Sequence, residues 1–394
     1  MAIELAQRVQ NIKPSPTLAL SAKAKAMIQA GEDVINMGVG EPDFDTPKHI
    51  KTKAIAAIEA GFTKYTAVPG IPELRQAVVD KFKHENQLDY ATDQTVVATG
   101  GKQIIYNLMQ ALLNPGDEVI VPAPYWVSYP DMVRLAEATP VIVNANIKQR
   151  FKINAEQLAK AISNKTRLFI INSPANPTGM AYTQTELKDL AQVLLQHPEI
   201  VILTDDIYEH ILWSQDFINI VNAAPELIDR TIVLNGVSKA YAMTGWRIGY
   251  AAGPKAIITA MAKIQSQSTS NACSIAQKAA LEALTGDQSE RETMRQAFKE
   301  RHDVAQHHLC QIPGIHCLAA DGTFYLFPDI SEIIQANEKF KDDTDFADQL
   351  LHQTGVAVVP GTAFGSPGHL RLSTALSLES IEAAIGRIRH FVAG

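Results

Sequence analysis

A lysine and an arginine that follow one apolar segment are the most informative residues of the chain. Lys239 ends the run Asn-Gly-Val-Ser-Lys, and Arg247 stands in the run Thr-Gly-Trp-Arg-Ile-Gly-Tyr that follows it. The segment 231–234 is apolar and β-branched, which predicts a buried strand. Residues just past the carboxyl end of a strand lie where open α/β sheets place their ligands. A lysine there could react with a carbonyl, and an arginine beside it could hold a phosphate.

A carboxylate and an amide follow two other predicted strands. Asp205 ends the run Val-Ile-Leu-Thr-Asp, and a buried carboxylate needs a partner such as a pyridinium nitrogen. Asp206 is expected to point the other way, because side chains alternate along a strand. Asn176, in a turn between prolines, and Tyr208 could both donate to a phenolate oxygen. A helix N-cap for Asp205 and simple turn formation for Asn176 stay open as alternatives.

Two further strand ends carry a glycine pair and a tryptophan. Gly100, Gly101 and Lys102 lie between a predicted strand and a predicted helix, where backbone N–H groups and the helix dipole favour an anion. The spacing matches neither a P-loop nor a dinucleotide-binding fingerprint. Trp126 follows another strand, and its indole could stack on a pyridine ring. Helix-start packing for the glycines and a place in the core for Trp126 are the alternatives.

Together these groups match what pyridoxal 5′-phosphate requires: an amine, a phosphate cradle, a ring plate, a phenolate partner and a carboxylate. The run at 235–250 also resembles the lysine motif of the class I aminotransferases, which are fold-type I pyridoxal-phosphate enzymes. Its part at 244–250 is similar to the aspartate aminotransferase branch. The resemblance extends over nearly the whole chain. Two departures are Ala175, where relatives often have a second asparagine, and Gly236, where distant relatives have a phosphate-binding serine.

The resemblance implies a role for each of these residues. Lys239 corresponds to the catalytic lysine that forms the Schiff base. The implied cofactor-binding residues are Gly101, Lys102 and Arg247 at the phosphate, Trp126 against the ring, Asn176 and Tyr208 at the phenolate oxygen, and Asp205 at the ring nitrogen. Tyr65 resembles a tyrosine that reaches the phosphate from the neighbouring subunit, which implies a homodimer with a shared active site.

The implied substrates are amino acids and 2-oxo acids. Arg371 lies between leucines, where an arginine usually holds a carboxylate through two hydrogen bonds, and it matches the family residue for the α-carboxylate. Gly40 matches a backbone position of the same pocket, which Trp126 and Asn176 would also line. Lys102 could meet a distal carboxylate, and Lys13 matches relatives that use both aspartate and prephenate.

We therefore expect an aspartate aminotransferase that exchanges amino groups with 2-oxoglutarate in a ping-pong cycle through a pyridoxamine form, with prephenate as a second acceptor. An aminotransferase for aromatic amino acids, alanine or kynurenine, or a related lyase, would share Lys239 and Asp205 and stays open. A regulator that uses this fold as a sensor would need a DNA-binding segment. We expect none, since the family-like motifs begin near Lys13.

Composition excludes several other classes. The 394 residues carry a formal net charge of −7, which disfavours a nucleic-acid partner. No signal peptide and no membrane span is expected, and three cysteines without metal or redox spacing suit a cytoplasmic protein. His302, His307, His308 and Cys310 are spaced as a solvated helix face, so no metal site is predicted.

The elements that must position these residues alternate along the chain. Strands are predicted at 95–99, 118–122, 140–143, 167–172, 200–205, 231–234 and 248–252, with helices between them. This order predicts an α/β fold with a mostly parallel central sheet flanked by helices. A smaller α+β domain would include strands at 324–327, 356–359 and 370–373. The predicted division is an N-terminal arm at 1–45, a large domain at 46–286, and a linking helix with the small domain at 287–394.

Overall fold

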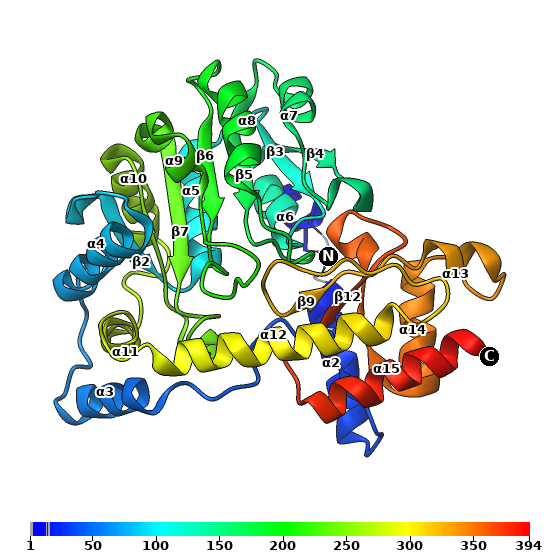
Figure 1. Cartoon of the computed structure of the whole chain (residues 1–394). Coiled ribbons are helices and arrows are strands. Elements are labelled where there is room, and N and C mark those ends of the chain that lie inside the picture. The colour runs from blue at the N-terminus through cyan, green and yellow to red at the C-terminus, as the bar shows by residue number, and fades with distance from the viewer. Residues whose placement is uncertain (1–2, 13, 15) are drawn as a thin grey trace.

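The computed structural model describes residues 3–12, 14 and 16–394. Its centre is a seven-stranded sheet of order β2-β8-β7-β6-β5-β3-β4, in which only β8 runs antiparallel to its neighbours (Figure 1). The strands are β2 (Thr95–Ala98), β3 (Glu118–Ala123), β4 (Thr139–Asn144), β5 (Thr166–Asn172), β6 (Val201–Asp205), β7 (Thr231–Gly236) and β8 (Gly249–Ala252). The prediction of a mostly parallel sheet is confirmed.

Apolar side chains on both faces of the sheet explain why helices cover both faces. Alternate residues of one strand enter different cores: Ile120 packs in one core, while Val119 and Val121 pack in the other. The first core is closed by α4 (Pro72–Asn86), α8 (Gln184–Leu195) and α11 (Ser274–Thr285), and the second by α5 (Gly101–Leu112), α6 (Ser128–Leu135) and α10 (Lys255–Ser266). Helices α3 (Lys48–Glu59), α7 (Ala155–Ala161) and α9 (Ile220–Ala223) complete this part of the chain.

The antiparallel strand β8 has a direct consequence for the site. The carboxyl ends of β2, β3, β5, β6 and β7 meet at one edge of the sheet, because these strands are parallel. Gly236 at the end of β7 pairs with Gly249 at the start of β8, so the segment before β8 returns to that same edge. Arg247 therefore lies at the edge where the parallel strands end.

A smaller part of the molecule follows the long helix α12 (Ser289–Leu309), which runs from below the large sheet to the C-terminal elements (Figure 1). These are β9 (Tyr325–Leu326), α13 (Ser331–Ala336), α14 (Asp343–Thr354), β10 (Val356–Ala357), β11 (Val359–Pro360), β12 (Leu370–Ser373) and α15 (Leu378–Ala393). Strand β1 (Ile35–Asn36) pairs with β10, and α2 (Pro16–Gln29) packs on β10 and β11. The three-part division of the chain stays a prediction, which these contacts support.

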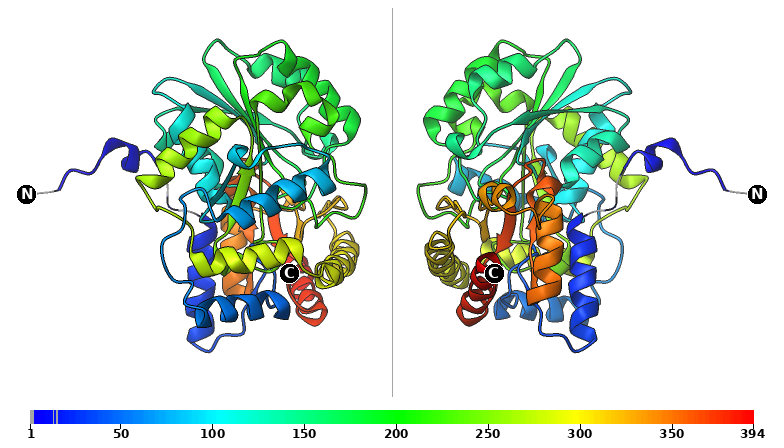
Figure 2. Two further views of the ribbon diagram at one scale, coloured as in Figure 1. Left: turned by 90° about the vertical axis from the view of Figure 1, so that its left-hand side faces the viewer. Right: turned by 90° about the vertical axis from the view of Figure 1, so that its right-hand side faces the viewer.

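Local signals in the sequence explain several element boundaries. Thr183 and Glu186 form the expected capping box at the start of α8, and Ser377 caps α15. The short helix α1 (Gln7–Gln10) belongs to an N-terminal segment that extends away from the rest of the molecule (Figure 2). No helix among the described residues is long and apolar enough to span a membrane.

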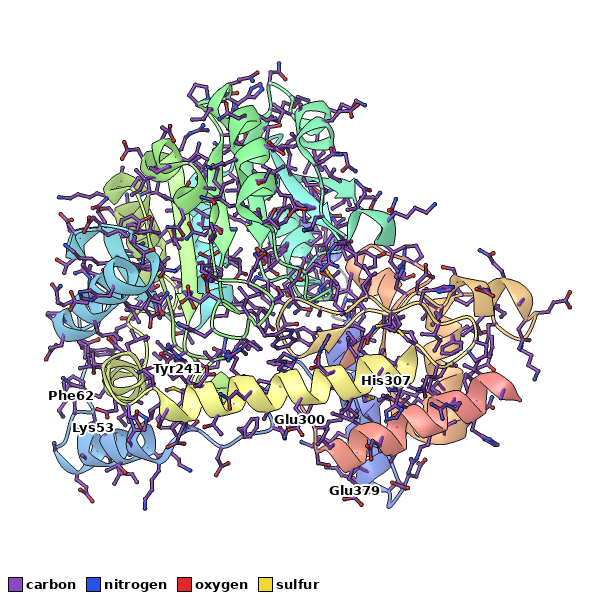
Figure 3. All side chains as sticks on the ribbon, viewed as in Figure 1. Lys53, Phe62, Tyr241, Glu300, His307 and Glu379 are labelled. Carbon is purple, nitrogen blue, oxygen red and sulfur yellow. The ribbon has the colours of Figure 1, made fainter. Side chains whose placement is uncertain are left out.

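Two expectations about helix faces were wrong. The spacing of Ile50, Ala54 and Ile58 in the sequence predicts that they share the apolar face of α3, but Ile58 is 54% exposed and Ala57 is buried instead. In α12 the solvated face was expected to include His302, but this ring is buried and its Nε2 accepts the Ala320 N–H at 2.9 Å. His307 does lie exposed on the same helix (Figure 3).

Candidate active site

A cavity of about 720 Å³ lies at the edge where the parallel strands end. It gathers residues from five strand ends, from the segment before β8, and from the smaller part of the chain. The predicted site residues that line it are Gly40, Gly101, Lys102, Trp126, Asn176, Asp205, Tyr208, Lys239, Arg247 and Arg371. The sequence therefore predicted which distant segments meet at one place.

Lys239 follows β7 and extends its amine into the cavity. Its Nζ donates to the Gly40 carbonyl oxygen at 2.5 Å and lies 5.9 Å from the ring centre of Tyr208. Burial, and then the neighbouring guanidinium of Arg371, lowers the pKa of Lys239 to about 8. A substantial fraction of this lysine is therefore neutral near physiological pH, which is the form that can act as a nucleophile or base.

Asp205 ends β6 and lies on the cavity side of the strand. The Tyr129 hydroxyl donates to its Oδ2 at 2.6 Å, and the Ile207 N–H donates to its Oδ1 at 3.3 Å. Burial raises the pKa of Asp205 to about 6, although the Tyr129 hydrogen bond and Lys239 act in the opposite direction. Asp206 faces away from the cavity, as the strand alternation predicts, and accepts hydrogen bonds from Thr204 and Asn219.

Two hydroxyls and an amide lie between Lys239 and Arg371. The Tyr208 and Tyr325 hydroxyl oxygens are 3.0 Å apart, and both rings are buried. The Asn176 backbone N–H donates to the Asn172 side-chain oxygen at 2.9 Å, which fixes the turn after β5. Asn176 is thus both a turn residue and a cavity residue, so the two readings of this position are compatible.

Glycines and cations form a cradle at the amino end of α5. Gly100 has a φ of +83°, and a Cβ built on it would lie 2.3 Å from Nη2 of Arg247. A Cβ on Gly249 would lie 2.3 Å from the Gly101 nitrogen, so both positions require glycine. The uncapped amino end of a twelve-residue helix beside Arg247 and Lys102 is suited to a phosphate.

Trp126 lines the cavity beside this cradle. The Lys102 ammonium lies 4.9 Å from the centre of the Trp126 ring. Burial within the cavity and then the Arg247 charge lower the pKa of Lys102. Because Trp126 is only half-buried, one part of its indole remains open to a ligand.

Arg371 enters the cavity from β12. Its Nη1 donates to the Asn176 side-chain oxygen at 3.0 Å, and its Nη2 donates to the Gly38 carbonyl oxygen at 2.8 Å. Its Nε is buried and has no hydrogen-bond partner among the described residues. No ion pair joins Arg371 to a carboxylate in the part of the chain that the structure describes, so this buried guanidinium with an unused donor is poorly satisfied without an anionic ligand.

One predicted site residue, Tyr65, does not lie in the cavity of this single chain. Tyr65 lies in the loop between α3 and α4 and is 92% exposed. It is not among the residues that line the cavity. Lys13 lies outside the described residues.

The sequence did not single out several residues that the structure places in the cavity. The Tyr129 hydroxyl hydrogen-bonds to Asp205, and the Tyr325 hydroxyl to that of Tyr208. The Glu41 carboxylate accepts a hydrogen bond from the Thr244 hydroxyl at 2.8 Å. Further polar residues that line the cavity include Thr17, Ser21, Lys25, Asn36, Asn172 and Ser238. A signal existed for Tyr129, because it follows Trp126 by one helical turn.

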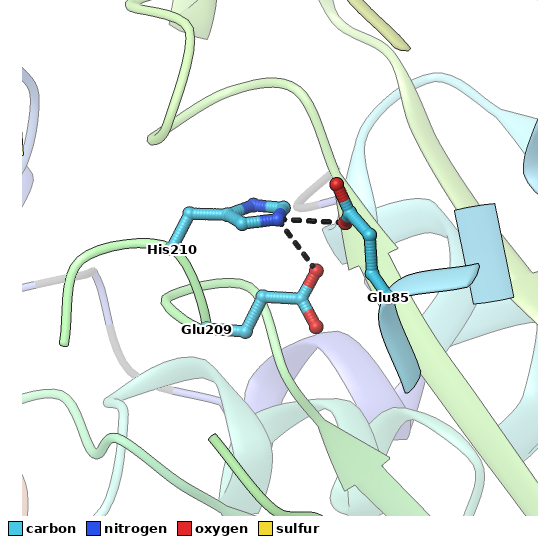
Figure 4. A group of neighbouring side chains, drawn as sticks. All are labelled: Glu85, Glu209 and His210. Carbon is cyan, nitrogen blue, oxygen red and sulfur yellow. Dashed lines mark hydrogen bonds and ion pairs between the residues drawn. The ribbon is translucent and has the colours of Figure 1, made fainter. Parts of the chain in front are cut away.

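A second group of charged side chains lies behind the loop that carries Asp205 and Tyr208. His210 Nε2 is 2.8 Å from a Glu85 oxygen and 3.3 Å from a Glu209 oxygen (Figure 4). The buried Lys81 ammonium pairs with Glu209 and lies 3.6 Å from Glu85, which Arg291 also contacts at 3.3 Å. A metal ion here would have to displace Lys81, so we assign this ion-pair network a structural role.

The network also reaches the segment that carries Lys239. The Tyr241 hydroxyl contacts Arg291 Nη1 at 3.1 Å and donates to Gln288 at 2.9 Å, beside the amino end of α12 (Figure 3). Although burial alone would raise it, His210 and the two cations lower the pKa of Glu85 to about 2. Both carboxylates of the network therefore stay ionised at neutral pH.

The cavity fits pyridoxal 5′-phosphate. The glycine cradle has room that any Cβ would fill, and two cations flank it. The remaining donor set supplies a carboxylate for a pyridinium nitrogen, hydroxyl and amide donors for a phenolate oxygen, an indole plate and a lysine amine. These groups come from the ends of several different strands, and all of them line one cavity.

Comparison with known proteins agrees with this site. Residues 32–388 match the family Aminotransferase class I and II. An aspartate/prephenate aminotransferase from Nitrosomonas europaea is 54% identical over 98% of this chain and 99% of its own length. A second protein of that name, from Cereibacter sphaeroides, is also 54% identical and covers 99% of both chains.

Solved structures of the same kind superpose closely. The aspartate aminotransferase from Rhizobium meliloti has a TM-score of 0.96 and 44% identity, covering 100% of this chain and 99% of its own. The Thermus thermophilus aspartate aminotransferase with maleate has a TM-score of 0.94 and 43% identity, covering 99% and 100%. These likenesses confirm the predicted fold-type I architecture.

Proposed function

The chain belongs to the class I and II aminotransferase family, and we propose that it moves the amino group of aspartate to a 2-oxo acid with pyridoxal 5′-phosphate as cofactor. The observation that carries this proposal is the cavity in which Lys239, Asp205 and Arg371 meet. When bound, the cofactor supplies an aldehyde for covalent attachment and a cationic ring that withdraws electrons from the substrate α-carbon. Every other part of the chemistry falls to side chains of this chain.

Lys239 would hold the cofactor and then move a proton. Its lowered pKa, about 8, gives a neutral amine at moderate pH. Once the substrate amine has taken its place, the freed Lys239 amine would take the proton from the substrate α-carbon and would later give a proton back. The Gly40 carbonyl, which accepts from Nζ in this structure, holds the amine on the cavity side.

Asp205, Tyr208 and Asn176 would fix the cofactor ring. An ionised Asp205 keeps the ring nitrogen protonated, and the Tyr208 hydroxyl and the Asn176 amide donate to the phenolate oxygen. Arg247, Lys102 and the N–H groups at Gly101 would hold the phosphate. Trp126 would cover one face of the ring and exclude water from it.

Two cations would select the substrate. Arg371 would bind the α-carboxylate through its guanidinium, whose Nε has no partner among the described residues. Lys102, exposed in the cavity beside Trp126, would meet the distal carboxylate of aspartate or glutamate. The maleate in the Thermus thermophilus structure is likewise a dicarboxylate.

Prephenate amination is the second activity that we propose. Its support is the name of the two relatives at 54% identity, which are aspartate/prephenate aminotransferases. Prephenate also carries two carboxylates, so Arg371 and a second cation would be used in the same way. The cavity of about 720 Å³ is large enough for a ring-bearing acceptor in addition to the cofactor.

We further propose a homodimer with a shared active site. Tyr65 is 92% exposed in the single chain, as expected for a side chain that completes the cavity of a partner subunit. Ile55 and Ile58 of α3 are 55% and 54% exposed, and Ile3 and Leu5 of the extended N-terminal segment are also exposed. Neighbouring exposed apolar side chains of this kind are typical of a surface that another protein chain covers. The cytoplasmic location stays a prediction.

A panel of single half-reactions tests the proposed substrates. Purified protein loaded with pyridoxal phosphate is mixed with one amino acid at a time, and loss of the visible cofactor absorbance is followed. Aspartate and glutamate should react fastest, and prephenate should restore the absorbance afterwards. Rapid reaction with alanine or kynurenine and none with aspartate would contradict the assignment to dicarboxylates.

A further inference from the structure

Tyr129 occupies an unusual position at the rim of the cavity. It lies in the first turn of α6, is 2% exposed, and lines the cavity together with Trp126 and Asp205. Its ring meets the indole of Trp126 edge to face, with centres 5.3 Å apart and planes at 86°. One side chain thus touches both the aromatic plate and the buried carboxylate.

The contact with Asp205 is short and directional. The Tyr129 hydroxyl donates to Oδ2 at 2.6 Å, and among the described residues no other side chain hydrogen-bonds to the Asp205 carboxylate. The Asn172 side-chain amide donates instead to the Asp205 backbone oxygen at 2.8 Å. The remaining donor is the Ile207 N–H, which is longer at 3.3 Å. Burial and the neighbouring carboxylate raise the pKa of Tyr129 well above its ordinary range, so its hydroxyl stays a donor at every physiological pH.

This hydrogen bond matters because Asp205 is an anion with little solvent. It is 5% exposed, and burial favours its neutral form. A donated hydrogen bond stabilises the charged form and opposes that effect. Without the Tyr129 hydroxyl, Asp205 would keep one long backbone contact and would also lose the constraint on the plane of its carboxylate.

We propose that Tyr129 is a positioning residue, which keeps Asp205 ionised and oriented toward the cofactor ring and supports the indole of Trp126 from its edge. The proposal rests on the proposed binding of pyridoxal phosphate. It assigns to Tyr129 no contact with substrate, so the effect of its removal should appear in cofactor binding and ring electronics. Substrate affinity, which depends on Arg371, should change little.

The test compares Tyr129→Phe with the wild type in three measurements. The dissociation constant for pyridoxal phosphate, measured on dialysed protein, should rise at least about tenfold, as for loss of a hydrogen bond to a charged group. The pH midpoint of the cofactor absorbance should move upward, because a less cationic ring withdraws fewer electrons. Turnover should fall while KM for aspartate stays the same.

Three further variants make the test specific. Tyr182→Phe is the matched control, because it also removes a buried hydroxyl contact, here with the Ile153 N–H at 3.0 Å, away from Asp205. It should leave cofactor affinity and the absorbance midpoint unchanged. Tyr129→His, which restores a donor, should recover part of the loss. In an Asp205→Asn background, Tyr129→Phe should have no further effect.

The outcomes separate this proposal from the proposed function. If the wild type binds no pyridoxal phosphate, the proposed function fails. If the wild type binds it and Tyr129→Phe binds equally well with an unshifted midpoint, only the role of Tyr129 is overturned. An equal loss in Tyr182→Phe would also overturn it, since the effect would then be one of general packing.

Discussion

Two groups of charged side chains lie on opposite sides of one short segment, residues 205–210, and each includes buried members. On the cavity side, the Asp205 carboxylate has one side-chain donor, and Arg371 has an Nε without a partner, both counted among the described residues. On the other side, Glu209 and Glu85 each pair with Lys81, and both contact His210 (Figure 4). The first group leaves charge uncompensated, and the second compensates it within the chain.

This difference distinguishes a ligand-binding site, on the cavity side, from an ion-pair network with a structural role. Uncompensated buried charge costs free energy, which a ligand of complementary charge can recover. The pKa of Asp205 is raised to about 6 and that of Lys239 is lowered to about 8, whereas the pKa of Glu85 is lowered to about 2. Left-handed backbone at Ala242 and Arg247 is also on the cavity side, where strain is common in functional sites.

Removal of the cavity lysine should give the largest effect on activity. Lys239→Ala should lower turnover at least about 10³-fold, since it removes both the attachment point and the base. The pKa of Lys239 in the folded protein lies below its ordinary value, so the charged amine destabilises the folded state below about pH 8. The variant should therefore melt no lower than the wild type. Lys160→Ala, at an exposed pair on α7, is the control for both measurements.

Removal of the lysine in the ion-pair network should lower stability and leave the cofactor absorbance unchanged. Lys81→Met leaves Glu209 buried without its cation and should lower the free energy of unfolding by about 3–5 kcal/mol, measured by urea unfolding of the cofactor-free protein. The pH midpoint of the cofactor absorbance should stay unchanged. Lys81→Met with Glu209→Gln should recover part of the stability. If Lys81→Met were as stable as the wild type and shifted the pH midpoint of the cofactor absorbance, the distinction between the two groups would be wrong.

A smaller effect is expected at the carboxylate-binding arginine. Arg371→Lys keeps the charge but loses the paired donors, which are worth about 1.5–3 kcal/mol. KM for aspartate should therefore rise by roughly 10- to 100-fold, while the melting temperature changes little. Arg295→Lys, at a surface pair with Glu292, should leave KM unaltered. An unchanged KM in Arg371→Lys would contradict the assignment.

The smallest effect is expected at Asp206, a buried carboxyl that forms no ion pair within either group of charged side chains. Burial raises the pKa of Asp206 to about 8, so its ionisation costs stability as pH rises from about 4 to 8. Asp206→Asn removes that cost and should melt at least about 2 °C above the wild type at pH 8. The difference should shrink toward pH 4. A pH-independent difference would show that Asp206 is paired.

The residues on the cavity side could be predicted from the sequence because two simple rules determine where they lie. Strands β5, β6 and β7 are apolar runs that end in polar residues, and parallel strands bring those ends together. Asp205, Asn176 and Lys239 are the first chemically useful residues after such runs. Family resemblance then added Arg371, whose strand lies in the other part of the chain.

The remaining contacts depend on packing that no local pattern encodes. Tyr129 and Tyr325 are aromatic residues in apolar surroundings, and only the fold shows that their hydroxyls meet Asp205 and Tyr208. Lys81 stands in an amphipathic helix, where lysines are ordinarily solvated, and no sequence pattern marks it as buried. Ile58 was misplaced because a series of steps of four residues drifts off the buried face of α3, which continues at Ala57 instead.

The most direct test of the account is to locate the covalent attachment. Protein loaded with pyridoxal phosphate is reduced with borohydride and digested, and the labelled peptide is sequenced by mass spectrometry. The account predicts a single pyridoxyl group on Lys239, and its absence when Asp205 is replaced by Ala and cofactor affinity is lost. A label on Lys102 or Lys81, or no label at all on the wild type, would contradict it.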